Sequence, residues 1–240
     1  EVTRATGSHV HPGGKGVNVT RAPLANAHDS LAVPPVGGAE GHRPTQLPEH
    51  DGVAHPSVPV TGETRSNITI AEPDGTTTKI NAPGETMTTA ELDAIAAQVL
   101  AVASPGDWVV LCGSLPPGVD VEVYARSTRA LKAAGMRVAV DTSGPALIAA
   151  LAGGPDLIKP NAEELADAVG RDLPTLGDAI AAAEELRGQG VATVVISLGG
   201  AGAVMVDADG VLAGASFAPE VRSSVGAGDC FLAGSLGAHD

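Results

Sequence analysis

Short apolar runs alternate with segments of helical spacing from about residue 88 onward. The runs of strand character are DWVVLCG (107–113), RVAVDTSG (137–144), PDLIKPN (155–161) and VATVVISLGGAGAVMVD (191–207), the last holding two strands around a Gly-rich turn. The segments of helical spacing between them are VEVYARSTRALKAAG (121–135), NAEELADAV (161–169) and LGDAIAAAEELRGQG (176–190). Strands that alternate with helices form βαβ units, which require a mostly parallel sheet with helices on both faces. The sequence therefore predicts an α/β fold that binds ligands beyond the carboxyl ends of its strands.

The stretch SNITIAEPDGTTTKIN (66–81) has a different pattern. Two β-branched, alternating runs flank EPDG, an insert with the Asp-Gly pair typical of tight turns. This pattern predicts an antiparallel hairpin. Because an isolated hairpin is marginally stable, we expect it to lie on, or to cover, another part of the protein.

The segment 23–59 is rich in proline, with Pro at positions 23, 34, 35, 44, 48, 56 and 59. A proline inside a helix costs about 3 kcal/mol. We therefore expect this segment to be irregular, or damaged relative to a helical ancestor.

Composition narrows the possible partners and compartment. The chain has 14 Lys+Arg against 28 Asp+Glu, a net charge of −14, which disfavours a general nucleic-acid or anionic-membrane surface. Any bound anion must be held by local groups. Cys112 and Cys230 form no CxxC pair, no run of 18 apolar residues occurs, and the N-terminus lacks the order of a signal peptide, so we expect a cytoplasmic protein. The chain begins without Met and stops at GAHD after a helical pattern, so we expect a longer reading frame cut at both ends.

The motif SSVGAGDCFL (223–232) places Gly226, Ala227 and Gly228 directly before Asp229. Small residues at the start of a helix let backbone N–H groups converge on one spot, where the helix dipole adds positive potential. Asp229 is then placed to accept a hydroxyl proton beside a transferring phosphoryl group. The alternative is that Asp229 merely caps the helix. The spacing matches neither a P-loop nor the GxGxxG dinucleotide motif.

The motif HPGGKGVNVTRA (11–22) combines groups suited to a sugar. Gly13 and Gly14 permit close backbone approach, Lys15 brings a positive charge, and the Asn18 amide both donates and accepts hydrogen bonds. The alternative is a mobile basic turn. Arg65, directly before the hairpin, is placed to reach the same ligand from a lid.

Two further motifs follow predicted strands. In KPNAEEL (159–165), Asn161 and Glu164 form either a capping box or part of a site that organises Mg²⁺ around a triphosphate. SLGGAG (197–202) is either a hairpin turn or a backbone platform for nucleotide phosphates. His9 and His11 lack a third ligand, so we do not expect a metal site there.

The order of these motifs resembles the PfkB, or ribokinase-like, family of carbohydrate kinases: GGKGVN, TRSNITI, CGSLPPG, KPNAEEL, SLGGAG, then SSVGAGDCF. The resemblance implies a three-layer sandwich with a mostly parallel central sheet and a small β lid. It implies one incomplete kinase domain over 1–240, with lid strands around 57–83 and an α/β core around 88–240. TRSNITI, TTTKINAPG and GSLPPG most resemble the 1-phosphofructokinase branch, which phosphorylates fructose 1-phosphate at its 6-hydroxyl. Tagatose-6-phosphate kinases and 6-phosphofructokinases share much of the pattern, so both stay open.

Roles for individual residues follow from the same resemblance. It implies that Asp229 is the catalytic base and that Gly226, Ala227 and Gly228 form the anion hole. For the sugar phosphate it implies Gly13, Gly14, Lys15, Asn18 and Arg65. For ATP it implies Lys159, Asn161 and the turn with Ser197, Gly199 and Gly202, and for Mg²⁺ an indirect role of Glu164. It also implies a homodimer, often formed through the lid.

The chain departs from the family pattern in three ways. Family members begin with a strand carrying an Asp in a motif like NPAxD, and they continue for several dozen residues after GAGD; both parts are absent here. They also have helices where this chain has RAPLANAH and GHRPTQLPEH. A non-catalytic, truncated homologue is therefore a further alternative.

Overall fold

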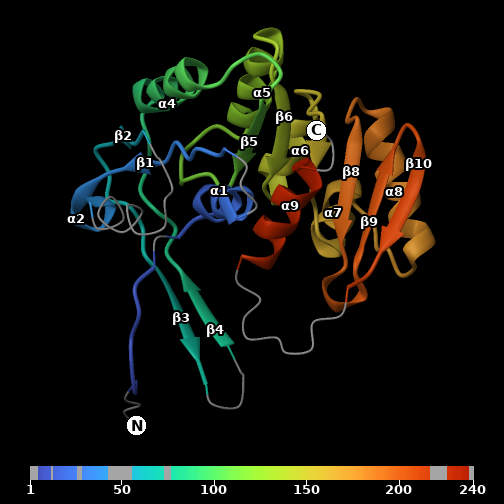
Figure 1. Ribbon diagram of the computed structural model, residues 1–240, viewed down its shortest axis with the longest axis horizontal. Coiled ribbons are helices and arrows are strands. Elements are labelled where there is room, and N and C mark those ends of the chain that lie inside the picture. Colours follow the sequence, from blue (N-terminus) through green and yellow to red (C-terminus); the bar gives the residue numbers. More distant parts are fainter. Residues whose placement is uncertain are drawn as a thin grey trace.

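A single six-stranded sheet forms the centre of the protein (Figure 1). The computed structural model describes residues 5–11, 13–25, 29–42, 56–72, 77–216 and 226–237. The strands, in spatial order, are β10 (Gly210–Gly214), β9 (Ala203–Asp207), β8 (Thr193–Ser197), β7 (Leu157–Ile158), β6 (Arg137–Asp141) and β5 (Trp108–Cys112). β5 to β8 are parallel, whereas β9 and β10 are antiparallel to their neighbours. The predicted mostly parallel sheet is confirmed.

Helices cover both faces of this sheet. One face packs on α5 (Val123–Ala133), α6 (Gly144–Leu151), α7 (Ala162–Val169) and α8 (Leu176–Gly188). The other packs on α1 (Lys15–Ala25) and α9 (Ala227–Gly237), which lie against each other in front of the sheet in Figure 1. Side chains alternate between the two faces, so that Val138 and Val140 join the first cluster and Ala139 joins the second. The expected three-layer α/β fold is confirmed.

The hairpin extends away from the sheet (Figure 1). β3 (Asn67–Ala71) pairs antiparallel with β4 (Thr77–Asn81), and Ile68 lies opposite Ile80. The predicted hairpin is confirmed, although its turn lies outside the described residues. Every residue of both strands is exposed.

The base of the hairpin is built from short elements. β1 (Pro35–Val36) pairs with β2 (Val58–Pro59), and these lie near α2 (Gly38–His42) and α4 (Thr89–Val102). Over the described ranges, no helix is both long and apolar enough to cross a bilayer.

The expectation of an irregular chain from residue 23 is wrong at its first position, because α1 continues through Pro23 to Ala25. Pro23 lies in the last turn, so it removes one intrahelical N–H and leaves most of the ladder intact. Val19 of α1 is buried in the same apolar cluster as Leu232 and Leu236 of α9, and this packing stabilises α1. Pro44 and Pro48 lie outside the described residues.

Candidate functional site

Several of the predicted residues meet at the carboxyl edge of the parallel strands. Lys159 directly follows β7, and Ser197 ends β8. The backbone N–H of Ser197 donates to the carbonyl of Pro160 (3.0 Å), and Asn161 pairs with Ser197 through an isolated parallel bridge. The motifs KPN and SLGGAG are therefore adjacent, at the edge where ligands of α/β sheets bind.

Asp229 lies inside the first turn of α9, which begins at Ala227. Its side chain is buried, with 8% of the residue exposed, and its Oδ2 accepts a hydrogen bond from Nδ2 of Asn18 on α1 (2.8 Å). The Asp229 carboxylate thus bonds to a different helix, and Asp229 does not occupy the capping position that the alternative interpretation gave it. The first-turn N–H groups of an α-helix have no partner within the helix, so this end of α9 offers N–H donors and positive potential beside the carboxylate.

Gly226 makes the turn into α9. It has a φ of 79°, a conformation that favours glycine, and its carbonyl accepts from the N–H of Cys230 (2.9 Å). A Cβ on Gly228 would lie 3.5 Å from Nζ of Lys159, so the GAGD backbone and the KPN lysine are neighbours.

A buried aspartate that sequence reasoning missed lies beside these groups. Asp141 ends β6 and is only 1% exposed. Its Oδ1 lies 2.9 Å from Nζ of Lys15 and 3.5 Å from Nζ of Lys159, which is 5% exposed. A carboxylate at the carboxyl end of a buried parallel strand was the signal available in the sequence.

The charge of Asp141 controls Lys15. Burial alone would lower the pKa of Lys15, but the charge of Asp141, the hydrogen bond to it, and the charges of Glu164 and Asp229 together raise that pKa above its ordinary value. Lys15 therefore stays protonated, and Glu164 faces the same site closely enough to act on it.

The glycine motif of residues 13–18 forms the start of α1. Lys15 is its first helical residue, Gly14 has a φ of 109°, and the N–H of Asn18 donates to the Gly14 carbonyl (3.1 Å). Lys15 is fixed by its ion pair with Asp141. Lys15 and Asn18 therefore belong to a helix and not to a turn.

Arg65 connects the hairpin to the loop after β5. Its Nη2 donates to Oγ of Ser114 (2.9 Å), and its Nη1 donates to the carbonyl of Pro83 (3.4 Å). Ser114 belongs to the GSLPPG motif and was not among the predicted site residues. Its hydroxyl group, next to an arginine, adds a candidate contact for a phosphate or a sugar.

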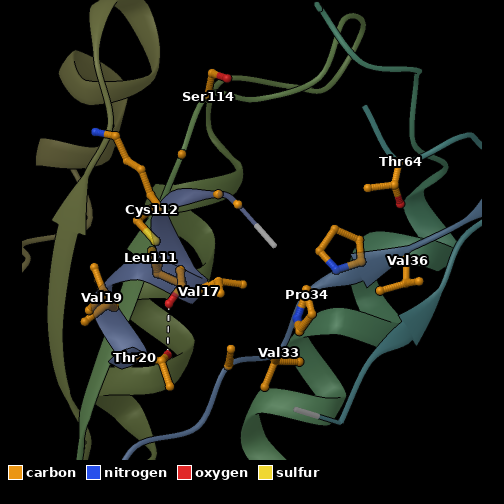
Figure 2. A pocket seen from close by; sticks show the side chains of 18 of the residues that line it. Val17, Val19, Thr20, Val33, Pro34, Val36, Thr64, Leu111, Cys112 and Ser114 are labelled. Atoms are coloured by element: carbon orange, nitrogen blue, oxygen red, sulfur yellow. Dashed lines mark hydrogen bonds between the residues drawn. The ribbon is translucent and has the colours of Figure 1, made fainter. Parts of the chain in front are cut away.

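A cleft of about 3100 Å³ separates the core from the lid base. It is lined by Gly13, Gly14, Lys15, Arg65 and Ser114, and by Cys230, the residue after Asp229. In Figure 2, Val17 and Cys112 lie on one wall and Val36 and Thr64 on the opposite one. Gly13, Gly14, Lys15 and Arg65 thus share one cavity, whereas Asn18 and Asp229 are not among the residues that line it.

The capping-box interpretation of KPNAEEL is confirmed. Oε2 of Glu164 accepts from the N–H of Asn161 (2.9 Å), and Oδ1 of Asn161 accepts from the N–H of Glu164 (2.8 Å). Among the described residues, no three His, Cys, Asp or Glu side chains are grouped to hold a metal. Mg²⁺ needs no such cage, because it keeps several waters and binds through one or two carboxylates and substrate phosphates. Half-buried Glu164, whose charge reaches Lys15, fits that mode of binding.

SLGGAG forms the turn between antiparallel β8 and β9, with a 3₁₀ helix, η2, at Gly199–Ala201. The N–H of Leu198 donates to the Gly202 carbonyl (2.9 Å). Gly202 has a φ of 103°, and a Cβ there would lie 2.2 Å from the Gly214 carbonyl oxygen, so only glycine fits. The hairpin-turn interpretation is confirmed, and the phosphate platform stays a prediction.

Known proteins are similar to this chain in sequence and in fold. Residues 1–239 match the family described as pfkB family carbohydrate kinase. The chain is 41% identical over 241 residues to the 1-phosphofructokinase of Rhodobacter capsulatus, covering 98% of this chain and 75% of the relative. It is 37% identical over 232 residues to the ATP-dependent 6-phosphofructokinase isozyme 2 of Escherichia coli K12, covering 95% and 75%. The structure of the tetrameric inhibited form of phosphofructokinase-2 from Escherichia coli matches with a TM-score of 0.91 and 35% identity, over 97% of this chain and 77% of that one.

These matches extend over nearly the whole chain and include both the sheet and the lid hairpin. They agree with the order of motifs in the sequence and with their convergence at one edge of the sheet. The chain therefore belongs to the pfkB family of carbohydrate kinases.

Proposed function

We propose that the chain transfers the γ-phosphoryl group of ATP to the 6-hydroxyl of fructose 1-phosphate, giving fructose 1,6-bisphosphate. The observation that carries this proposal is the hydrogen bond between Asn18 and Asp229. It joins the glycine motif suited to a sugar to the carboxylate that starts α9. The names of the relatives, which are fructose-phosphate kinases, support the substrate class.

Substrate binding is assigned to the cleft. The backbone at Gly13 and Gly14 and the Asn18 amide would hold the sugar hydroxyls, while Arg65 would hold its phosphate. We further propose that residues 57–83 act as a lid on the core of residues 88–240 within one kinase domain. A closed lid excludes water, which strengthens these charged contacts.

The chemistry is assigned to the start of α9. Asp229 accepts the proton of the 6-hydroxyl as its oxygen attacks, and the backbone N–H groups of Gly226, Ala227 and Gly228 stabilise the charge on the phosphoryl group that moves.

Nucleotide binding is assigned to the carboxyl edge of the sheet. Lys159, Asn161 and the turn with Ser197, Gly199 and Gly202 would bind the ATP phosphates. Mg²⁺ neutralises phosphate charge when it is bound, and Glu164 would hold its waters.

A coupled ADP-release assay tests the function. It compares kcat/KM for fructose 1-phosphate, fructose 6-phosphate and tagatose 6-phosphate, each with ATP and Mg²⁺. We expect fructose 1-phosphate to give the highest value. Preference for fructose 6-phosphate would assign the activity of the Escherichia coli isozyme instead. A folded chain that binds ATP and turns over none of the three would be an inactive homologue.

We also propose that the protein is a cytoplasmic homodimer joined through the lid. Both cysteines, Cys112 and Cys230, are free thiols, as a reducing compartment permits. Ile68, Ile70 and Ile80 are 56%, 48% and 53% exposed, and the apolar face that they form needs a cover. A related kinase is described as tetrameric in an inhibited form, so a measured mass must distinguish a dimer from a tetramer.

A further inference from the structure

Asp141 carries a charge that the proposed reaction does not yet use. Its side chain is 1% exposed, and its backbone, at the end of β6, pairs with Cys112 and accepts a hydrogen bond from the N–H of Gly113. Burying a carboxylate is costly unless it is paired. We therefore expect the buried carboxylate of Asp141 to position the charged groups that it contacts.

Asp141 holds two lysines from different elements. Its Oδ1 is 2.9 Å from Nζ of Lys15 at the start of α1 and 3.5 Å from Nζ of Lys159 after β7. Among the described residues its Oδ2 has no hydrogen-bond partner, so no other donor competes for the carboxylate. Two ammonium groups this close repel each other, and the carboxylate between them offsets that repulsion.

Lys15 and Lys159 both lie near the start of α9. Nζ of Lys159 lies against Gly228, the residue before Asp229. Asn18 follows Lys15 by three residues on α1, which places both on one face of the helix, and Asn18 bonds to Asp229. Lys15, Lys159 and Asp141 together carry one positive charge, which lies near the carboxylate of Asp229 at the start of α9.

We propose that Asp141 is a positioning residue for phosphoryl transfer, which holds the ammonium groups of Lys15 and Lys159 next to the start of α9 so that both face the transferring phosphoryl group. This inference rests on the proposed function for the reaction, but its central claim concerns the binding of a γ-phosphate. That claim is measurable without turnover.

Binding of the Mg²⁺ complexes of AMP-PNP and ADP tests it, because only AMP-PNP carries a γ-phosphate. We expect Asp141→Asn to weaken AMP-PNP binding about tenfold to hundredfold, the range for charge-assisted contacts, and to change ADP binding much less. Asp156→Asn is the matched control. Asp156 pairs with Lys132 (2.7 Å) before β7, at the opposite edge of the sheet, and should leave both affinities unchanged.

The pH dependence separates positioning from a structural role. Without the charge of Asp141, burial lowers the pKa of Lys15, and only Glu164 and Asp229 oppose it, while Lys159 adds repulsion. Burial raises the pKa of Cys112, the nearby thiol, to about 12, so Cys112 stays neutral. From about pH 7 to about pH 9.5, AMP-PNP binding should weaken steeply in Asp141→Asn and little in the wild type.

A second variant guards against loss of folding. Lys15→Met with Asp141→Asn removes one positive and one negative charge, so the net charge of the cluster is kept. It should lose more AMP-PNP affinity than Lys15→Met alone, because Lys159 is no longer held.

Each outcome decides between the claims. Equal AMP-PNP-to-ADP ratios in the wild type and both Asp141 variants would overturn the inference, even if the enzyme is active. A wild type that shows no turnover but binds AMP-PNP more tightly than ADP, with that preference lost in Asp141→Asn, would overturn the proposed function alone. Wild-type protein that binds AMP-PNP no better than ADP would also overturn the inference.

Discussion

The hydrogen bond from Asn18 fixes the orientation of the Asp229 carboxylate. Asn18 donates to Oδ2, and Asp229 is buried in the first turn of α9, where the N–H groups have no partner within the helix. A carboxylate held this way is oriented before any substrate arrives. Proton transfer by such a group typically contributes about 10²- to 10⁴-fold to the rate.

We therefore predict that Asp229→Asn lowers kcat by about 10²- to 10⁴-fold with little change in the affinity for fructose 1-phosphate. Asparagine keeps an oxygen that accepts from Asn18 but cannot take a proton. Steady-state kinetics give kcat, and calorimetry gives the affinity. Asp209→Asn, in the exposed turn before β10, is the control and should match the wild type. Loss of sugar binding together with turnover would contradict the role of base.

At this scale the sequence shows which residues carry chemistry, but it does not show their partners. Asp229 and Lys15 are visible from their glycine-rich surroundings. Their partners Asn18 and Asp141 are 211 and 126 residues away along the chain. In the sequence Asp141 is simply the end of a strand, because nothing local shows that the fold brings it next to Lys15 and Lys159. Charge pairing across the fold is therefore the part that local patterns miss.

Among the elements, the β8–β9 turn depends most on one residue type. Gly202 combines a φ of 103° with a position where a Cβ would lie 2.2 Å from the Gly214 carbonyl oxygen. Gly200, two residues earlier, has nothing within 4 Å of a Cβ. The two glycines form a matched pair in the same turn.

We predict that Gly202→Ala lowers the Tm by several degrees, at about 2–4 °C for each kcal/mol lost, because the turn must open to admit the methyl group. Gly200→Ala should change the Tm by less than about one degree on the same scale. Thermal unfolding of both variants followed by circular dichroism is the measurement. Equal Tm values for the two would show that the turn tolerates a side chain at Gly202.

The N-terminus of α4 connects the lid base to the core through Glu91. Its carboxylate accepts from the N–H of Thr61 (2.6 Å), and from the N–H and hydroxyl of Thr88 (2.7 and 2.8 Å). These bonds, that from Thr61 first, lower the pKa of Glu91 to about 2 from the usual 4.5. The stabilisation is therefore complete above about pH 4.5 and is lost as the pH falls toward 2.

We predict that Glu91→Gln lowers the Tm at neutral pH and that the difference from the wild type shrinks as the pH falls below 4.5. Glu122→Gln is the control, since Glu122 makes no side-chain cap bond at the start of α5. Melting curves over a series of pH values measure both. A Tm difference that is constant with pH would contradict the role of the Glu91 charge.

Elements were predictable where local pattern and tertiary packing agree. The alternating apolar runs gave β5 to β9 because each of these strands is buried on at least one face. The prediction failed at Pro23, because the local cost of proline was judged without the contact of α1 with α9. The short strands β1 and β2 have no sequence signal, since two residues carry no periodicity.

For the molecule as a whole, the lid hairpin matters because every described residue of its two strands is exposed. The register places Ile68 opposite Ile80 and Ile70 opposite Thr78 on one face, whereas Thr69 lies opposite Lys79 on the other. One face is therefore apolar and the other polar, and a two-stranded sheet with both faces in water is marginally stable. A second copy that covers the isoleucine face would remove apolar area from water and fix the lid beside the cleft.

We predict that the wild-type protein has about twice the 23.7 kDa chain mass in light scattering and that Ile80→Glu converts it to the monomer mass. A charge at Ile80 would be buried without a partner in the dimer, at a cost that the apolar contact does not offset. Thr69→Glu adds the same charge to the opposite face, next to Lys79, and should leave the dimer intact. A wild-type monomer would overturn the dimer, and equal loss of mass in both variants would show that the lid binds through its polar face. A wild-type mass of four chains that Ile80→Glu does not reduce would place the subunit contacts outside the lid.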